Sequence, residues 1–274
     1  MIEKKYAKWL FFLVNLIIGA IILSPLLYAL GASFMTEAEL INYPPALIPS
    51  SLHLTNYTAA LRMAPIFRFI LNSVIVATAC TAAQVFTGAL AGYAFGILHF
   101  KGKKELFFLM LATMMIPGQA IIIANYLTVV KLSQIDKFGA LILPYMASAF
   151  CVFNMRQAFL SLPSELNESA TIDGCNSFQF FIRIGLPLTK PSLGSLGIYT
   201  FLGVWNQYLW PLLVTNSVEM RTVQIGIGML QNADANAYGP IMAGTIMILV
   251  PSILLFIIGQ KSLISGLTAG AVKG

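Results

Sequence analysis

The sequence predicts an all-α membrane protein with six transmembrane helices, and three observations support this prediction. The chain has 274 residues, of which 58% are hydrophobic and only 9% charged, whereas a soluble domain carries roughly 25% charged residues. Six stretches contain no Lys, Arg, Asp or Glu: 9–36, 69–100, 106–130, 138–155, 191–218 and 235–260. The lysines and arginines gather in alternate segments between these stretches, as they do in multi-pass membrane proteins.

Each charge-free stretch is long enough for a spanning helix, which needs about 20 residues with a lower limit of roughly 17. The apolar runs are continuous rather than alternating, which favours helices over the strands of a barrel. We therefore expect one domain over 1–274, with an N-terminal helix at 9–32 and core helices within 68–264. The expected core helices are 68–97, a span that begins at 106, 138–160, 190–213 and 239–264.

The individual helices carry different local signals. The stretch 68–97 is rich in Ala and Gly, which let helices approach closely in lipid, so we expect this helix to be buried among its neighbours. Pro117-Gly118 should interrupt the next span, which frees backbone groups that only protein or a wet cavity can satisfy. Pro251 is a candidate kink in the last helix. The Pro-rich segment after the first helix is expected on the outer surface.

The distribution of basic residues predicts the orientation of the chain. With the N-terminus inside, the inner segments hold Lys4, Lys5, Lys8, Lys101, Lys103, Lys104, Arg156, Arg183, Lys190, Lys261 and Lys273. The outer segments hold only Arg62, Arg68, Lys131, Lys137 and Arg221. We therefore expect both termini and the segment 156–190 in the cytoplasm. The net charge of +6 is then a topology signal, and no nucleic-acid partner is expected.

The first helix resembles a secretory signal peptide in part, because it has a basic start and Ala29-Leu30-Gly31 as a loose cleavage pattern. The apolar run from Trp9 to Leu30 is longer than a typical signal core of roughly 7–15 residues. We therefore expect this segment to stay in the protein as a spanning helix.

Reactive side chains are few and scattered. Cys80, Cys151 and Cys175 are not paired at metal-ligand spacing, so we expect small buried apolar side chains and no metal site. His53 and His99 both fall in loops, which disfavours a membrane enzyme. Spans without charge also disfavour a secondary transporter, which usually carries intramembrane charges or inverted repeats with interrupted helices. A regulatory or scaffold membrane protein stays open on these grounds.

The polar segment 161–189 is expected to form two short helices outside the bilayer. Ser161 or Ser164 can cap the first helix, with Pro163 in its first turn. Gly174 suits a helix end that needs a positive φ angle.

A second short helix should begin at Ser177 and stop at Pro187, before the fifth span. The residues alone leave two interpretations of this segment: a surface that docks a partner protein, or an amphipathic linker that lies on lipid head groups.

A longer pattern in this segment resembles a known family. Glu-x-Ala-x-x-Asp-Gly, nine residues, then Ile-x-Leu-Pro looks like the cytoplasmic signature loop of ABC importer permeases. The residues that match it are Glu168, Ala170, Asp173, Gly174, Ile184, Leu186 and Pro187, with Ser169 where the family usually has Ala. In that family the loop forms coupling helices that dock into a cleft of an ATPase, so the resemblance implies this role for these eight residues.

The resemblance extends over nearly the whole chain. The segments SFMTEAEL, LNSV, WNQYLWPL and GLTAGAVKG are similar to those of the smaller permease of carbohydrate importers of the maltose type, and also to the glycerol-3-phosphate permease. This resemblance implies a multi-pass subunit in the cytoplasmic membrane of a bacterium or archaeon. It also implies that the cytoplasmic tail, 265–274, reaches the ATPase.

The function implied is to form half of the import pathway for a sugar or oligosaccharide, with glycerol-3-phosphate or a glycerophosphodiester as the alternative cargo. The implied partners are a second permease, a dimer of ATP-binding subunits, an extracytoplasmic solute-binding protein and lipid. The chain itself has no phosphate-binding loop, because Gly96 and Gly102-Lys103 have the wrong spacing. No cofactor is therefore expected on this chain, and ATP and Mg²⁺ belong to the partner ATPase.

Uncharged polar side chains inside the expected spans are candidates for lining a pathway. These are Asn72, Gln84, Asn125, Asn206 and Gln207, and Trp205 beside them could stack on a sugar ring. Two alternatives stay open: hydrogen bonds between helices for the amides, and an aromatic belt near the interface for Trp205, Tyr208 and Trp210.

Overall fold

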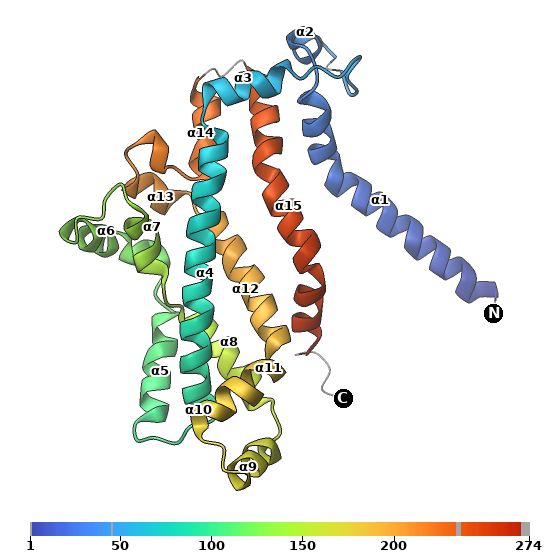
Figure 1. The fold of residues 1–274 in the computed structure, drawn as a ribbon. Coiled ribbons are helices and arrows are strands. Elements are labelled where there is room, and N and C mark those ends of the chain that lie inside the picture. Colours follow the sequence, from blue (N-terminus) through green and yellow to red (C-terminus); the bar gives the residue numbers. More distant parts are fainter. Residues whose placement is uncertain (1, 45, 234–236, 270–274) are drawn as a thin grey trace. The chain divides into compact units, whose positions relative to one another are not determined.

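The computed structural model describes residues 2–44, 46–233 and 237–269, and every regular element within these ranges is a helix. This confirms the expected all-helical class (Figure 1). The chain divides into two compact units, one made of residues 1–66 with 226–250 and the other of residues 67–225 with 251–274. Each unit is described by itself.

The first unit contains the long apolar helix α1 (Ile2–Ala32), the short helices α2 (Glu37–Ile41) and α3 (Thr55–Met63), most of α14 (Val223–Ala233) and the first part of α15 (Tyr238–Ala269). No residue in the most apolar window of the span Lys8–Ala32 of α1 is buried within the chain, as expected for a helix solvated by lipid or by another subunit. Helix α15 continues through Pro251 to Ala269. Of the expected tail 265–274, residues 270–274 lie outside the described ranges.

Polar contacts hold the segment between α1 and α3. Thr36 and Glu39 form a capping box at the start of α2, which satisfies backbone donors that the first helical turn leaves unpaired. The second carboxylate oxygen of Glu39 accepts a 2.9 Å hydrogen bond from the backbone N–H of Ser50. The amide of Asn56 donates to the carbonyl oxygens of Ser33 and Met35. Side-chain hydrogen bonds therefore hold the Pro-rich segment that follows α1.

The second unit contains the remaining helices. They are α4 (Ile66–Gly96), α5 (Lys103–Thr113), η1 (Gly118–Ile121), α6 (Ile122–Lys131), α7 (Phe138–Ile142), η2 (Leu143–Tyr145), α8 (Ala149–Leu160), α9 (Ser164–Ile172), α10 (Ser177–Phe180), η3 (Phe181–Gly185), α11 (Leu186–Leu188), α12 (Lys190–Trp205), α13 (Leu209–Val214) and η4 (Val218–Met220).

The described residues do not form the six uninterrupted spans that the sequence predicts. Three helices are long and apolar enough to cross a membrane, and two further stretches are bent pairs, with angles of 90° after Thr113 and 46° after Tyr145. The expected helix 190–213 is divided between α12 and α13. Proline explains two of these breaks, because Pro117 and Pro211 each lack an N–H and crowd the carbonyl four residues earlier, at Thr113 and Gln207.

The helix rich in small residues, α4, packs closely against α8 on one face, although only 39% of its most apolar window is buried within the chain. A Cβ atom added at Gly88 would lie 2.8 Å from Cys151 Cβ, and one added at Gly92 would lie 2.6 Å from Met155 Cβ. Both contacts are too short for a side chain, so glycine sets the distance between these two helices. Cys80 and Cys151 are fully buried, as expected, whereas Cys175 is partly exposed.

Candidate coupling segment and membrane cavity

The segment from α9 to α11 lies at one end of α4 and α8 (Figure 1). Helix α9 begins after Pro163 without a side-chain cap. The expectation that Ser161 or Ser164 caps it is therefore wrong, since the Ser161 hydroxyl donates instead to the carbonyl of Ala158. Pro163 is the residue just before the first turn and not part of that turn. At this position its fixed φ angle ends the preceding loop.

Gly174 ends α9 as predicted. Its φ angle is +78°, the left-handed region that favours glycine. The N–H of Cys175 donates to the carbonyl of Ala170, and the N–H of Gly174 donates to that of Thr171. These two bonds form a Schellman motif, which satisfies the last carbonyls of the helix and sets the direction in which the chain leaves it.

The second short helix begins at Ser177, as predicted, with a capping box between Asn176 and Gln179. Pro187 does not stop it. The chain passes from α10 through one π turn, in which the N–H of Leu186 bonds to the carbonyl of Phe181, into α11 and then α12. The π turn adds a residue before the proline ring, so the helix changes its winding instead of ending.

A buried cluster fastens this segment to the membrane helices. The ring of Tyr93 on α4 contacts the rings of Phe159, Phe180 and Phe181, with centroid distances of 5.4, 6.3 and 5.0 Å. Its hydroxyl donates a 2.9 Å hydrogen bond to the carbonyl of Ser177. Helices α4, α8 and α10 therefore share one aromatic core with the start of η3.

The structure separates the eight residues of the signature pattern into two groups. Glu168, Ser169, Asp173, Gly174 and Pro187 are exposed. Ala170 is only 5% exposed and belongs to the aromatic core, and Ile184 and Leu186 pack against that core.

Ala170 thus faces the chain's own interior, not the outer surface on which Leu166 and Ser169 lie. Sequence reasoning missed Ile172, which is 86% exposed, whereas Phe178, 65% exposed, lies on the second short helix that it predicted. The apolar character of Ile172 in a polar segment was the available signal.

A cavity of about 620 Å³ lies in the second unit, where two spans break. One break separates η2 from α8 at Met146–Ser148, and the other separates α12 from α13 at Asn206–Tyr208. The cavity is lined by Gln84, Tyr145, Ala147, Ser148, Phe150, Tyr199, Thr200, Leu202, Gly203, Val204, Asn206 and Gln207. Broken helices at membrane depth are typical of transporter binding sites.

Of the residues predicted to line a pathway, three reach this cavity: Gln84, Asn206 and Gln207. Asn72 does not, because it is 1% exposed and its amide donates to the carbonyls of Glu219 and Arg221.

Trp205 is 3% exposed and packs on Phe201, and Asn125 lies on α6. Neither is among the lining residues. Sequence reasoning missed Tyr145, Phe150 and Tyr199, which no spacing distinguishes from ordinary apolar residues.

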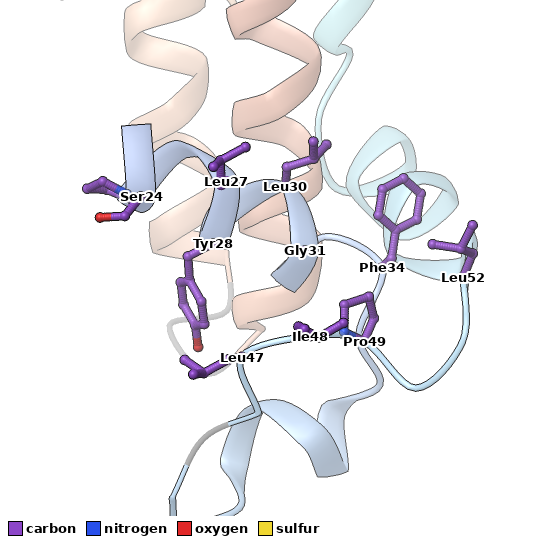
Figure 2. Close-up of a pocket in the computed structure, with 11 residues that line it drawn as sticks. Ser24, Leu27, Tyr28, Leu30, Gly31, Phe34, Leu47, Ile48, Pro49 and Leu52 are labelled. Carbon is purple, nitrogen blue, oxygen red and sulfur yellow. The ribbon is translucent and has the colours of Figure 1, made fainter. Parts of the chain in front are cut away.

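A larger groove, about 810 Å³, lies in the first unit between the end of α1 and the loop 47–52. Figure 2 shows Leu27, Tyr28 and Leu30 of α1 on one side of this groove and Leu47, Ile48 and Pro49 of the loop on the other. Only Ser24 and Tyr28 bring polar side-chain atoms to it. The groove therefore lacks the convergent polar groups that orient a polar ligand.

Comparison with known proteins agrees with this architecture. Residues 84–262 match the family described as binding-protein-dependent transport system inner membrane component. The chain is 36% identical over 270 residues to the arabinooligosaccharides transport system permease protein AraQ of Halalkalibacterium halodurans, with 97% of each chain covered. It is 35% identical to the sn-glycerol-3-phosphate transport system permease protein UgpE of Brucella melitensis, with 97% of this chain and 98% of that protein covered.

The fold is also similar to a chain in the crystal structure of a bacterial ABC transporter involved in the import of the acidic polysaccharide alginate. The TM-score is 0.82 at 18% identity, and the match covers 94% of this chain and 97% of that chain. From the family match over most of its length and from these relatives, the chain belongs to the family of inner membrane components of binding-protein-dependent transport systems.

Proposed function

We propose that this chain is a transmembrane subunit of an ATP-driven importer and that the exposed face of α9 to α11 docks on a separate ATPase. The observation that carries the proposal is the rigid attachment of this segment to α4 and α8 through Tyr93 and its ring partners. An element that transmits motion must be stiff itself and stiffly joined to what it moves. The Schellman motif and the capping box supply the first property, and the aromatic core supplies the second.

The connections at both ends of the segment support the same role. Helix α8 ends at Leu160, and α9 begins at Ser164. Helix α11 ends at Leu188, and α12 begins at Lys190. Because residues of both α8 and α12 line the 620 Å³ cavity, a displacement of the docked segment changes the walls of the cavity. This is the requirement for alternating access driven from outside the chain.

Charge favours a protein partner over the alternative of an amphipathic linker on lipid. Ile172 and Phe178 would enter a partner's groove, and Glu168 and Asp173 are exposed on the same segment. Anionic lipid head groups attract basic helices and repel carboxylates. The exposed face is therefore matched to a groove that offers apolar surface with basic side chains around it.

The remaining parts of the proposal follow the sequence and the relatives. Both termini lie in the cytoplasm, a second permease completes the pathway, and a solute-binding protein delivers the cargo outside. The partner ATPase, not this chain, binds ATP and Mg²⁺, and the complex lies in the cytoplasmic membrane of a bacterium. The cargo is a sugar or oligosaccharide, as the name of the AraQ relative indicates for that protein. Glycerol-3-phosphate is the second candidate, because the UgpE relative of Brucella melitensis is nearly as similar, at 35% identity against 36%.

Gly174 provides the test. A Cβ at this position would meet no atom within 4 Å, so a substitution acts only through the backbone. Valine disfavours the left-handed region, in which an ordinary residue loses roughly 1–2 kcal/mol, whereas asparagine tolerates it.

The complete transporter in proteoliposomes should lose ATP hydrolysis stimulated by the binding protein, and uptake with it, in Gly174→Val. Gly174→Asn should retain both activities. Normal uptake by the valine variant would rule out this segment as the coupling element.

A further inference from the structure

We infer that the apolar groove between α4 and α12 binds an anionic phospholipid of the cytoplasmic leaflet. An acyl chain lies along the groove, and the phosphate group meets Arg183 and Lys190 at one end. The inference rests on the proposed function, which puts the segment from α9 to α11 on the cytoplasmic side, and it adds a lipid site that supports this segment. Three features carry it: the apolar lining of the groove, its length, and the basic side chains at its end.

The groove has a volume of about 910 Å³ and lies within the second unit. Residues of α4 and α12 form its two long walls, and residues of η3 and α11 border one end. Among the described residues that line it, only Thr78 and Thr81 carry polar side-chain atoms. A sugar, a phosphate or another polar group in the groove would lose water without gaining enough hydrogen bonds in return, whereas a hydrocarbon chain meets no such cost.

The length of the groove matches the depth of one leaflet. Its lining on α4 runs from Thr78 to Leu90, which is about 18 Å at a rise of 1.5 Å per residue. One leaflet contributes about half of a hydrocarbon core of roughly 30 Å. The wall of α12 is low at Gly197, where an added Cβ would have only Thr81 Cγ2 within 4 Å, at 4.0 Å. An extended acyl chain therefore has room between the two helices.

Basic side chains border the end of the groove that η3 forms. Lys190 is the first residue of α12 and shares a helix face with the lining residues Leu193 and Gly197, three and seven positions further on. Arg183 follows Ile182, another lining residue, on η3. Both basic residues are exposed. Arg and Lys bind phosphate groups, and basic pockets between membrane helices on the cytoplasmic side bind anionic head groups.

Charge favours a lipid over a transmembrane helix of the second permease as the occupant. Residues 177–197 contain no Asp or Glu, so this stretch offers no carboxylate to Arg183 or Lys190. The carboxylates Glu168 and Asp173 belong to α9 and to its end. A second permease carries Lys and Arg at the cytoplasmic ends of its own helices and would add like charge at this end of the groove, whereas a phospholipid brings a phosphate.

The bound lipid acts on the joint between the short helices and α12. Phe181 lines the groove and also belongs to the aromatic core, with its ring 5.0 Å from that of Tyr93. A chain packed against Phe181 and Ile182 fills the space beside the π turn η3, whose winding departs from that of a regular helix. We therefore expect the ATP hydrolysis that the binding protein stimulates to depend on anionic lipid.

The test uses the complete transporter in lipid nanodiscs with two photoactivatable probes, phosphatidylglycerol and phosphatidylcholine, which carry the reactive group on the same acyl chain. Cross-linked peptides are mapped by mass spectrometry. The bilayer consists of phosphatidylcholine alone or of equal parts phosphatidylcholine and phosphatidylglycerol, and stimulated ATP hydrolysis is measured in both. Arg183→Gln with Lys190→Gln removes both charges at the groove. Lys101→Gln with Lys104→Gln, at exposed positions around the start of α5, makes the same changes away from the lining residues and is the matched control.

The phosphatidylglycerol probe should label residues 78–90 and 193–201 of the wild-type protein, and the phosphatidylcholine probe should label them far less. The groove double variant should lower labelling by phosphatidylglycerol roughly 30-fold, the equivalent of two lost charge contacts. It should also abolish the dependence of ATP hydrolysis on phosphatidylglycerol, while the control double variant retains both properties.

Equal labelling by the two probes would mean contact with bulk lipid only and would overturn the inference. So would the absence of lipid labelling, the result expected if a helix of the second permease fills the groove, and so would equal hydrolysis in the two bilayers. Because the comparison of the two probes needs no variant, it decides the question even if a substitution prevents assembly. Absence of stimulated hydrolysis in both bilayers, with the groove still labelled, would instead contradict the proposed function.

Discussion

Tyr93 donates a 2.9 Å hydrogen bond to the carbonyl oxygen of Ser177, so that one residue of a membrane helix fastens the first turn of the second short helix. Tyr93 lies on α4 and is 5% exposed. The same α4 also contributes Gln84 to the cavity. One helix thus contacts both the segment proposed to receive the ATPase and the cavity at the two helix breaks.

This relationship predicts a graded effect of substitutions at Tyr93. Tyr93→Phe keeps the ring contacts and loses only the hydrogen bond, which contributes about 1 kcal/mol. Tyr93→Ala also removes the ring and should cost about 3–5 kcal/mol. Thermal unfolding of the purified complex should rank the variants in this order. Tyr126→Phe on the exposed side of α6 is the matched control, and an unfolding midpoint that is the same for all three variants would contradict the assignment.

A second prediction concerns the contact between α4 and α8. Gly92→Leu would place a Cβ within 2.6 Å of Met155 Cβ and 2.8 Å of the backbone nitrogen of Arg156. Because backbone atoms cannot turn aside, the helices must separate, and we expect a large loss of folded protein in the membrane. Gly19→Leu on α1 is the control, since a Cβ at that position meets nothing within 4 Å. Equal yields of the two variants in a quantitative membrane fraction would show that the contact is not needed.

The loop at Glu39 should make the first unit sensitive to acid. Hydrogen bonds from Ser50 and Thr36 lower the pKa of Glu39 from 4.5 to about 2. A carboxyl group whose pKa falls on folding stabilises the folded state above its unfolded pKa, and this contribution is lost as the pH falls. The stability that depends on Glu39 should therefore decrease between about pH 4.5 and about pH 2.

Glu39→Gln removes the titrating group and should flatten the pH profile of thermal stability in that window. Glu37→Gln on the same helix is the control, and it should keep the wild-type profile. A profile that Glu39→Gln leaves unchanged would mean that these hydrogen bonds do not stabilise the loop.

The fourth prediction concerns the contribution of Asp136 to stability, in the loop that joins α6 to α7. Its Oδ1 atom accepts hydrogen bonds from the N–H groups of Asn216 and Ser217 and from the Ser217 hydroxyl. Although partial burial alone would raise the pKa of Asp136, these bonds and the charge of Arg221 hold it below its ordinary value. Its φ angle is +62°, which Asn tolerates better than Ala.

Asp136→Ala should therefore lower the thermal midpoint of the complex, because it removes about 1 kcal/mol for a hydrogen bond and adds backbone strain. Asp136→Asn retains the acceptor oxygen and should stay close to the wild type. If both variants unfold at the same temperature, neither the acceptor nor the φ angle matters at this position.

Local features of the fold were predictable from the sequence because they depend on neighbouring residues. The Gly174 helix end and the helix start at Ser177 were predicted correctly, since turn and capping chemistry acts over a few positions. The cap of α9 and the stop at Pro187 were predicted wrongly. Ser161 does not cap α9 because its hydroxyl bonds to the carbonyl of Ala158. Pro187 does not stop the second short helix because a π turn precedes it.

The sequence by itself determined that this chain is a helical membrane protein with a helix–glycine–helix segment between two spans, because composition and short-range spacing carry that information. Only the tertiary structure decided that Ala170 faces inward and that Gln84, Asn206 and Gln207 share one cavity while Asn72 is used to hold a loop. These residues come from elements far apart in the chain. Which of them meet depends on how glycine contacts and proline breaks place whole helices, and no local pattern encodes that arrangement.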